Sequence, residues 1–487
     1  MPQFDLERFR TEQMDRLKSG TLDLLVLGGG ILGAGVARDA TLRGLRVGLV
    51  EQHDVAFGTS SRTSRLLHGG LRYLAQGRVG LVRQASQEKR ILYRIAPHLA
   101  QPLAFVFPTY RRSGWPLWKL RVGVQLYDWL CGGGNLGPSS AMRADEVLNR
   151  LPGPRREGLT GAVRYYDALT NDARLVIDTL RSAADHGAIA LNYARAEAAE
   201  PIHDAWRCQI RDRLGDRCFE VLARVVVHAT GPWASALPQS SLRLRLTKGV
   251  HVVIQRDRLP VPDAVVITEG QRILFAIPWG DRVILGTTDT DYTGPLDDVR
   301  TSPEDVDYIL EAVNRAFPAA GIDRQDVVSV WAGVRPLIAQ RGGGPSDISR
   351  AHQIRQPHRG WIDVGGGKLT TYRRIAQEVV DRVFVRLGRP CPPCRTAELP
   401  LVEPDHTRPE ASGVLPPEPS ESLVMYYCHK EWAVHLQDVM VRRTSWRRYY
   451  RDHRELAERV AVWMAGALRW DAAKLRAELN HYDSEHS

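Results

Sequence analysis

The sequence is poor in the features that mark secreted, metal-binding or membrane-spanning proteins. Its 487 residues include six cysteines, too few and too scattered for a disulfide framework. The one C-x-x-C pair, Cys391 and Cys394, lacks the second pair that would complete a zinc site. The longest apolar stretch, residues 24–37, is too short to span a bilayer, and residues 1–20 carry charges where a signal peptide needs an apolar core. These absences predict a cytoplasmic protein without a metal site.

The charge balance is basic, with a net charge of +10 and a pI near 9.4. Such a balance suits nucleic acid, an anionic membrane or a small anionic substrate. The basic residues form no nucleic-acid reading motif, so we expect no nucleic-acid partner. Hydrophobic residues make up 43% of the chain, which is enough for two or three domains with a large core.

Arginines and aromatic residues are concentrated in residues 441–470. They are Arg442, Arg443, Arg447, Arg448, Arg451 and Arg454 with Trp446, Tyr449, Tyr450 and Trp463. One interpretation is a surface that binds an anionic membrane. The other is a solvated helix pair with aromatic core contacts, which is favoured because Asp452, Glu455 and Glu458 dilute the basic charge.

A glycine-rich turn near the N-terminus is typical of a dinucleotide-binding site. An apolar strand leads into Gly28, Gly30 and Gly33, which fit the G-x-G-x-x-G pattern. Gly28 permits the tight turn, Gly30 lets the backbone approach a pyrophosphate, and Gly33 lets the next helix pack close to the strand. The following apolar strand delivers Glu51, where a carboxylate binds a ribose hydroxyl and disfavours the 2′-phosphate of NADP.

Periodicity and turn residues divide the rest of the chain. Helical patterns cover residues 1–20, 79–95, 172–186 (with Asp172 as the N-cap), 303–317 and 420–487. Strand patterns cover residues 188–193, 206–210, 225–231, 250–254, 273–277, 283–286, 327–335 and 361–367. Residues 97–154 mix Trp, Pro and Gly, which indicates an inserted element that covers a site.

This order of elements predicts an α/β protein. We expect a doubly wound dinucleotide-binding domain, an inserted, mostly antiparallel β substrate domain and a small helical C-terminal domain. The expected boundaries are residues 1–96, 155–245 and 326–398 for the discontinuous dinucleotide-binding domain, 97–154 and 246–325 for the substrate-binding or cap domain, 399–419 for a linker, and 420–487 for the helical domain.

Seven motifs together resemble one family. They are residues 28–35, 59–61 with 67–74, 229–233, 248–251, 286–289, 333–337 and 366–373. They resemble the FAD-dependent, aerobic-type glycerol-3-phosphate dehydrogenases and α-glycerophosphate oxidases, within the wider D-amino-acid-oxidase-like flavoproteins. The resemblance covers about residues 24–374. It implies a Rossmann-like domain that binds FAD without a covalent link, and oxidation of sn-glycerol 3-phosphate to dihydroxyacetone phosphate.

The resemblance also implies a set of cofactor contacts. The expected FAD-binding residues are Gly28, Gly30, Ile31, Leu32, Gly33, Glu51, Thr59, Ser60, Ser61, Leu66, His68, Gly69, Gly231, Gly366, Gly367, Lys368, Leu369 and Thr370. His68 is assigned to packing or hydrogen bonding, because this branch of the family holds FAD noncovalently. The helix that begins after Lys368, together with the Lys368 ammonium group, is expected to favour negative charge on the flavin.

Substrate contacts are expected from two arginines and a histidine. Arg72 and Arg335 match the family's substrate-binding arginines, and guanidinium groups bind phosphate bidentately. His251 is the expected base for the substrate hydroxyl, because an ordinary histidine pKa of about 6.5 suits proton acceptance at neutral pH. A core or surface role for this strand histidine is the alternative. Tyr73 and Lys368 are expected to orient or polarise the same oxygen, and His251, Arg335 and Lys368 form the expected catalytic set.

The motifs do not encode the electron acceptor. We expect quinone, because the basic aromatic C-terminal region offers a route to the cytoplasmic face of a membrane. The alternatives are an oxygen-using glycerophosphate oxidase, a flavin oxidoreductase for another hydroxy or amino acid, and a noncatalytic flavin-binding protein. The oligomeric state is open, with a homodimer among the options. Asn171 and Arg65 depart from the family pattern, which has an acid and a lysine at these places.

Overall fold

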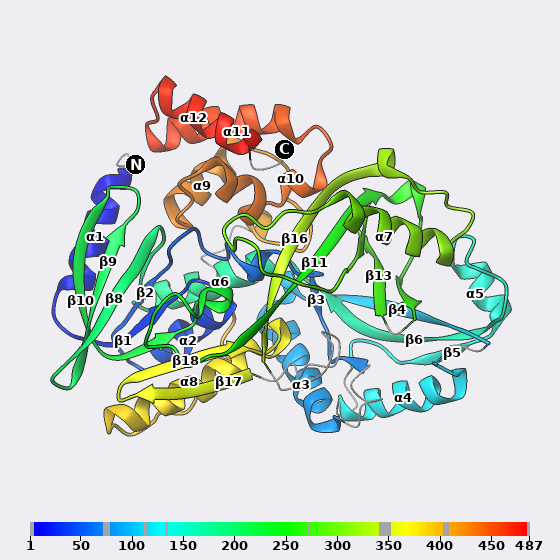
Figure 1. Ribbon diagram of the computed structural model, residues 1–487, viewed down its shortest axis with the longest axis horizontal. Coiled ribbons are helices and arrows are strands. Elements are labelled where there is room, and N and C mark those ends of the chain that lie inside the picture. Colours follow the sequence, from blue (N-terminus) through cyan, green and yellow to red (C-terminus); the bar gives the residue numbers. More distant parts are fainter. Residues whose placement is uncertain are drawn as a thin grey trace.

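The computed structural model describes residues 4–71, 78–111, 114–131, 135–270, 272–339, 352–402 and 409–484. These residues form two β-sheets that lie side by side, with helices on the sheet faces and a helical C-terminal region above them (Figure 1).

The first sheet is built around parallel strands. It contains β1 (Leu22–Leu27), β2 (Val47–Val50), β7 (Ile189–Leu191), β8 (Ala194–Ile202), β9 (Ala205–Asp212), β10 (Arg217–His228), β17 (His352–His358) and β18 (Trp361–Gly366). The strand order is β17-β18-β10-β1-β2-β7, and β9 and β8 extend the sheet from β10. The strands from β18 to β7 are parallel to their neighbours, whereas β17, β9 and β8 pair antiparallel.

Helices cover both faces of this sheet. α2 (Ile31–Leu42), α6 (Asp172–Asp185) and α8 (Tyr372–Leu387) share one core with strand residues such as Val26. α1 (Leu6–Lys18) packs on the other face, where Leu17 lies in a core with Leu25. Burial on both faces explains why the parallel strands are almost entirely apolar. The expected doubly wound α/β architecture is confirmed.

The second sheet is mostly antiparallel. It contains β3 (Leu66–Leu67), β4 (Gln101–Tyr110), β5 (Ser140–Met142), β6 (Leu159–Leu169), β11 (Leu244–Gln255), β12 (Ala264–Glu269), β13 (Arg272–Trp279), β14 (Arg282–Gly286), β15 (Thr290–Asp291) and β16 (Val327–Ile338). The order is β15-β11-β14-β13-β12-β4-β6-β3, with β16 paired to β11 and β5 to β6. Only the pair of β4 and β12 is parallel among the described strands of this sheet.

Four further helices flank the second sheet. α5 (Ala144–Arg150) and α7 (Pro303–Ala316) contribute Val147 and Ile309 to the core on one face. α3 (Val79–Ile95) and α4 (Leu117–Leu130) contribute Val82 and Val124 to the core on the other face. The insertion at residues 97–154 thus becomes part of the second sheet and its helical cover.

Strand pairing places three strands differently from the expected domain boundaries. The sequence division puts residues 1–96, 155–245 and 326–398 in the FAD-binding domain, but β3, β6 and β16, one from each segment, pair with strands of the second sheet. An alternating apolar pattern identifies a strand without revealing which sheet it joins.

The C-terminal region is a compact helical unit. It contains α9 (Glu421–Lys430), a π-helix (Asp438–Arg443), α10 (Trp446–Tyr449), α11 (His453–Leu468) and α12 (Ala472–Ser484). Trp446 is fully buried in its core, next to residues of α9 and α11.

Neither interpretation of residues 441–470, the membrane surface or the favoured solvated helix pair, holds for four of the six arginines named for them, and only Arg451 and Arg454 of the six are exposed. Arg442, Arg443, Arg447 and Arg448 are all buried, and so are not solvated either. Arg442 and Arg443 both donate to the buried carboxylate of Asp54, in the loop that follows β2. Burial alone would raise the pKa of Asp54, but the two arginines hold it below its ordinary value. The charge pattern therefore reflects a buried ion-pair clamp between the C-terminal region and the loop that follows β2 of the first sheet.

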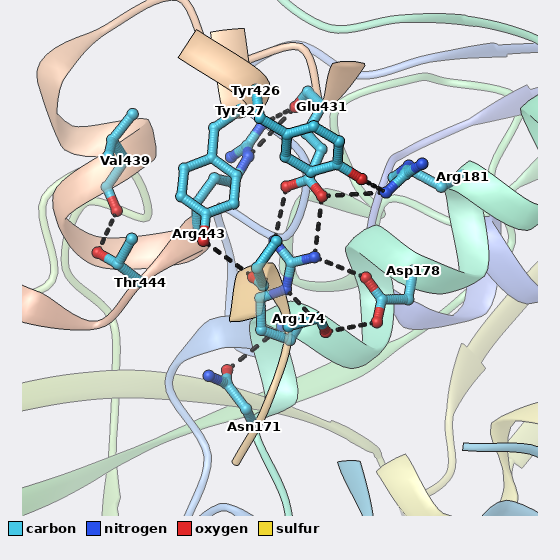
Figure 2. Close-up of polar contacts among 12 residues, drawn as sticks. Asn171, Arg174, Asp178, Arg181, Tyr426, Tyr427, Glu431, Val439, Arg443 and Thr444 are labelled. Atoms are coloured by element: carbon cyan, nitrogen blue, oxygen red, sulfur yellow. Dashed lines mark hydrogen bonds and ion pairs between the residues drawn. The ribbon is translucent and has the colours of Figure 1, made fainter. Parts of the chain in front are cut away.

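A second buried network joins the C-terminal region to α6 (Figure 2). Both oxygens of Glu431 accept from Arg174, at 2.6 and 2.9 Å, and Arg174 also donates to Asp178 at 2.7 Å. The backbone carbonyl of Glu431 accepts from Arg443, which links this network to the Asp54 clamp. The helical region is therefore an integral part of the fold.

The N-cap of α6 is Asn171, and the expected Asp172 cap is wrong. The Asn171 side chain accepts from the Arg174 amide at 3.3 Å. Asp172 instead accepts from the amide and hydroxyl of Thr63, each at 2.8 Å. Across the described ranges, we find no helix with the length and apolar character required to cross a bilayer.

Candidate active site

A cavity of about 460 Å³ lies between the two sheets. The residues at the carboxyl ends of β1, β2, β10 and β18 line one part of it: Leu27, Val50, His228 and Gly366. In parallel α/β sheets this edge is where ligands bind. Strands β4, β6, β11, β13 and β16 of the second sheet line the other part.

The glycine turn after β1 brings its backbone to the cavity wall. Gly28 has φ of +108°, and a Cβ there would lie 2.7 Å from the Ala229 carbonyl oxygen. A Cβ on Gly33 would lie 1.9 Å from the Gly28 carbonyl oxygen, so only glycine lets α2 pack this close. Gly28, Gly30, Ile31 and Leu32 line the cavity, whereas Gly33 lies behind it.

Glu51 lines the cavity directly beside this turn. Its carboxylate accepts from the Gly29 amide at 2.6 Å and from the His53 amide at 2.9 Å. Burial raises the pKa of Glu51, and the hydrogen bonds from the Gly29 and His53 amides oppose that rise. One further acceptor position on each oxygen suits a ribose hydroxyl.

The loop of residues 58–62 closes over the start of α2. Ser60 Oγ accepts from the Ile31 amide at 3.1 Å, and Thr59 donates to the Val334 carbonyl of β16 at 2.5 Å. Both residues line the cavity. Ser61, an expected cofactor contact, is buried outside the cavity lining, and its carbonyl accepts from Arg448.

Two glycine-rich segments meet on the opposite wall. The His68 amide donates to Thr370 Oγ1 at 3.0 Å, which joins the loop after β3 to the turn that leads into α8. Gly366 and Gly367 have φ of +74° and +80°, and they line the cavity with Lys368, Leu369 and Thr370. Gly69 does not line it, and its amide donates to Tyr127 of α4 at 2.9 Å.

His251 lies on β11 at the substrate-sheet end of the cavity. Its Nε2 is 2.8 Å from Ser64 Oγ, and its ring stacks on Trp331 with centroids 5.0 Å apart. Nδ1 is buried with no hydrogen-bond partner in the described structure. Burial, followed by the charges of Arg335, Arg448 and Arg65, lowers the pKa of His251 well below its usual value. The imidazole is therefore neutral at physiological pH.

Buried arginines form the wall behind His251. The Arg448 guanidinium lies 5.0 Å from the centroid of Trp331, and Arg65 lies 4.4 Å from that of Trp279. Arg65 donates to Ser445, which also comes from the C-terminal region. The C-terminal region thus reaches the back of the catalytic pocket.

Arg335 projects from β16 toward the same end of the cavity. Its guanidinium donates to the Thr288 carbonyl at 3.2 Å, to Asp289 at 3.1 Å and to the Thr287 hydroxyl at 2.9 Å. Gly249 makes room for it, because a Cβ there would lie 2.2 Å from Arg335 Nη2. A guanidinium held in this way presents a fixed positive charge to an anionic ligand.

Comparison with known proteins decides the family. Residues 23–381 match the model of the FAD dependent oxidoreductase family (DAO). Aerobic glycerol-3-phosphate dehydrogenase of Staphylococcus aureus strain USA300 is 38% identical over 408 residues, which cover 81% of this chain and 73% of that protein. The chain belongs to the FAD-dependent glycerol-3-phosphate dehydrogenase family.

Solved structures agree with this assignment. The glycerol-3-phosphate dehydrogenase of Bacillus halodurans, complexed with FAD, is 28% identical with a TM-score of 0.78 over 98% of this chain and 96% of that one. The FAD-bound L-α-glycerophosphate oxidase of Mycoplasma pneumoniae is 15% identical, with a TM-score of 0.60 over 75% of this chain and 95% of that one, and so shares the fold.

Family membership makes this chain an FAD-dependent oxidoreductase, and its residues fit the cofactor. The glycine turn leaves no room for side chains, Glu51 has acceptor positions for a ribose, and the cavity continues to the glycines before α8. These are the features that a dinucleotide of this length requires.

Most of the expected site residues come together at the cavity. Of the cofactor set, all line it except Gly33, Ser61 and Gly69, and so do His251 and Arg335. Arg72 and Tyr73 lie outside the described residues. Side chains missed at the sequence level include Ser64, Phe105, Tyr165, Phe275 and Thr287. Only Thr287 had a signal, since it lies in the motif at residues 286–289; the others come from strands or loops with no distinctive pattern.

Proposed function

We propose that this enzyme oxidises sn-glycerol 3-phosphate to dihydroxyacetone phosphate. The observation that carries the proposal is the placement of Arg335, a fixed cation, and His251, a neutral base, at the same end of the cofactor cavity. A phosphorylated secondary alcohol needs both groups: one for the phosphate and one for the hydroxyl proton.

Each residue has a separate task in this proposal. Arg335 binds the phosphate and so orients the alcohol carbon. Ser64 Oγ, 2.8 Å from His251 Nε2, is in position to pass the hydroxyl proton to the ring. The lowered pKa of His251 keeps the ring unprotonated and so free to accept the proton, although it makes the ring a weaker base than the ordinary imidazole expected from the sequence. The aromatic rings of Phe105, Tyr165 and Phe275 contact one another and add an apolar wall to the cavity.

The cofactor would be held by the residues that line the first part of the cavity. Backbone amides at the start of α2 would face the pyrophosphate, Glu51 the ribose, and Lys368 with the turn before α8 the flavin ring. FAD, when bound, accepts the hydride that leaves the alcohol carbon.

We propose quinone as the electron acceptor, which would place the enzyme on the cytoplasmic face of a membrane. The name of the Staphylococcus aureus relative, an aerobic dehydrogenase, supports a dehydrogenase over an oxidase.

The test is an anaerobic titration of the purified holoenzyme followed by flavin absorbance. Glycerol 3-phosphate should bleach the flavin, whereas glycerol, lactate and glycine at the same concentration should not. A quinone analogue should then restore the colour faster than air does. Bleaching by glycine or lactate in preference would overturn the substrate, and faster recovery in air would favour an oxidase.

A further inference from the structure

A second cavity, of about 220 Å³, lies apart from the cofactor site. Its walls come from α1, from α6 and β7 with the residues that flank them, and from the end of α9 with the segment that follows it. α1 and α9 are found at the upper left of Figure 1. None of the described residues that line this cavity lines the cofactor cavity. Ligand pockets are usually larger than about 300 Å³, so this one suits a small ligand.

The wall of this cavity combines aromatic rings with positive charge. Its rings and cations are Phe4, Phe9, Trp432, Arg10, Arg16 and Lys430. No carboxylate is among the described residues that line it. Arg16 and Lys430 are exposed, and Arg16 donates to the side-chain oxygen of Gln13 at 3.1 Å. Cations without acids beside them favour a ligand of negative charge.

Two buried nitrogens of lining side chains have no hydrogen-bond partner in the described structure. They are Arg10 Nε and His429 Nε2. Arg10 is only 4% exposed, and its Nη2 donates to Asp212 at 2.6 Å and to the Asn192 carbonyl at 2.9 Å, which leaves Nε for a ligand. The His429 ring stacks on Phe4, with centroids 4.6 Å apart. A buried donor without an acceptor is costly, so a ligand that brings an acceptor gains affinity here.

We propose that this cavity binds a small aromatic carboxylate. The carboxylate accepts from Arg10 Nε and from His429 Nε2 when that nitrogen carries the ring proton. The two exposed cations add attraction for its charge, and its ring packs on the aromatic side chains of the wall. An inorganic anion would leave those rings uncovered, whereas a neutral aromatic molecule would leave the cations without a partner.

Asn192 connects this cavity to the Asp54 clamp. Its side-chain amide donates to Asp54 at 3.2 Å and to the Trp432 carbonyl at 2.8 Å, and its own carbonyl accepts from Arg10. The ligand therefore contacts α1 and the C-terminal region where both meet the first sheet. Because the unfolded chain lacks this site, the ligand stabilises the fold.

Isothermal titration of FAD-loaded Arg335→Met with benzoate tests the proposal. This parent lacks the cation that would bind an anion in the cofactor cavity. Benzoate should bind at one site per chain and raise the melting temperature. Benzamide, which has the ring without the charge, should bind at least tenfold more weakly. Inorganic phosphate, which has the charge without the ring, should also bind at least tenfold more weakly.

Two variants of the cavity, each made in the same parent, locate the site. Arg16→Gln/Lys430→Gln removes the two exposed cations, and Ala184→Leu fills the cavity from a half-buried position while keeping every charge. Each should weaken benzoate binding at least tenfold. The control Lys119→Gln/Arg121→Gln removes the same two kinds of charge from exposed positions on α4, outside the cavity, and should bind like the parent.

The proposal is overturned if the parent does not bind benzoate, or if benzamide or phosphate binds equally well. It is also overturned if either cavity variant, shown to be folded by its full FAD content, binds benzoate like the parent.

Discussion

The two ends of the cavity are built in different ways. The nucleotide end consists largely of backbone, arranged by glycines within a few residues of one another and by Glu51. The substrate end consists of side chains from distant segments: Ser64 and His251 are 187 residues apart, and Arg448 contacts Ser61 from 387 residues away. A pyrophosphate can be held by amides that any short turn supplies, whereas a phosphorylated alcohol needs particular side chains from several elements.

The largest effect is expected from the nucleotide end. Gly33→Ala would place a Cβ 1.9 Å from the Gly28 carbonyl oxygen, which is backbone and cannot move aside. We expect the purified variant to contain no FAD and to lose about 3 kcal/mol or more of folding free energy. Flavin absorbance and chemical denaturation measure the two effects.

The control for this variant is Gly466→Ala in α11, where a Cβ meets nothing within 4 Å. It should keep FAD and gain up to about 1 kcal/mol of stability. Full FAD content in Gly33→Ala would contradict the tight-turn argument.

The next effect concerns the clamp between the C-terminal region and the nucleotide end. Asp54→Asn leaves the buried Arg442 and Arg443 without their shared carboxylate. Breaking a buried ion pair costs about 3–5 kcal/mol, so we expect a matching fall in the free energy of unfolding. Exposed Asp452→Asn should change it by less than about 0.5 kcal/mol. Equal stability of the two variants would mean that the clamp contributes nothing.

A smaller effect separates substrate binding from folding. In Gly249→Ala, the new Cβ would lie 2.2 Å from Arg335 Nη2. The Arg335 side chain is flexible, so its guanidinium group would move away from this position. We expect the half-saturating concentration of glycerol 3-phosphate to rise by roughly tenfold, equal to about 1.4 kcal/mol, with little loss of FAD. Gly114→Ala, which meets nothing within 4 Å, is the matched control. An unchanged half-saturating concentration would argue against a role of Arg335 in substrate binding.

The smallest effect is a shift in pH dependence. The pKa of His251 is lowered by burial first and then by Arg335, Arg448 and Arg65, so its neutral form persists to a pH well below 6.5. Arg448→Met removes one of these positive charges and should raise that pKa. The acid limb of the kcat/KM profile should therefore move to higher pH, whereas exposed Arg454→Met should leave it in place. If the acid limb of the Arg448→Met profile stayed at the wild-type pH, Arg448 would not control the pKa of His251.

The contrast between the two ends also explains what the sequence could predict. The glycine turn and the helices predicted at residues 79–95 and 303–317 follow from local patterns, and the structure confirms them, with α7 ending at Ala316. It also places Glu51 beside the turn, as its position after an apolar strand predicted. The burial of Arg442 and Arg443 could not be predicted, because their partner Asp54 lies almost 390 residues away. The pairing of β16 with β11 could not be predicted either, since the apolar pattern of a strand does not show which strands lie next to it.

The surface chemistry shows the same limit. Interleaved arginines and aromatics at residues 441–470 suggested an interface, but four of the six arginines in this pattern and Trp446 lie in the interior, and only Arg451 and Arg454 of the six are exposed. The exposed Trp118 and Trp129 lie in the insertion at residues 97–154, where the sequence indicated only a cover for the site. Which side of an amphipathic helix faces solvent depends on what the rest of the chain covers.

The most direct test of the account is the anaerobic rate of flavin bleaching by glycerol 3-phosphate in Arg335→Met and His251→Asn, each loaded with FAD. Arg335→Met should raise the half-saturating concentration at least tenfold, because it removes the phosphate contact. His251→Asn should leave that concentration nearly unchanged and lower the limiting rate by about 10²–10⁴-fold, because it removes the base. Wild-type bleaching in His251→Asn, or a common loss of both parameters in the two variants, would contradict the separate roles assigned to them.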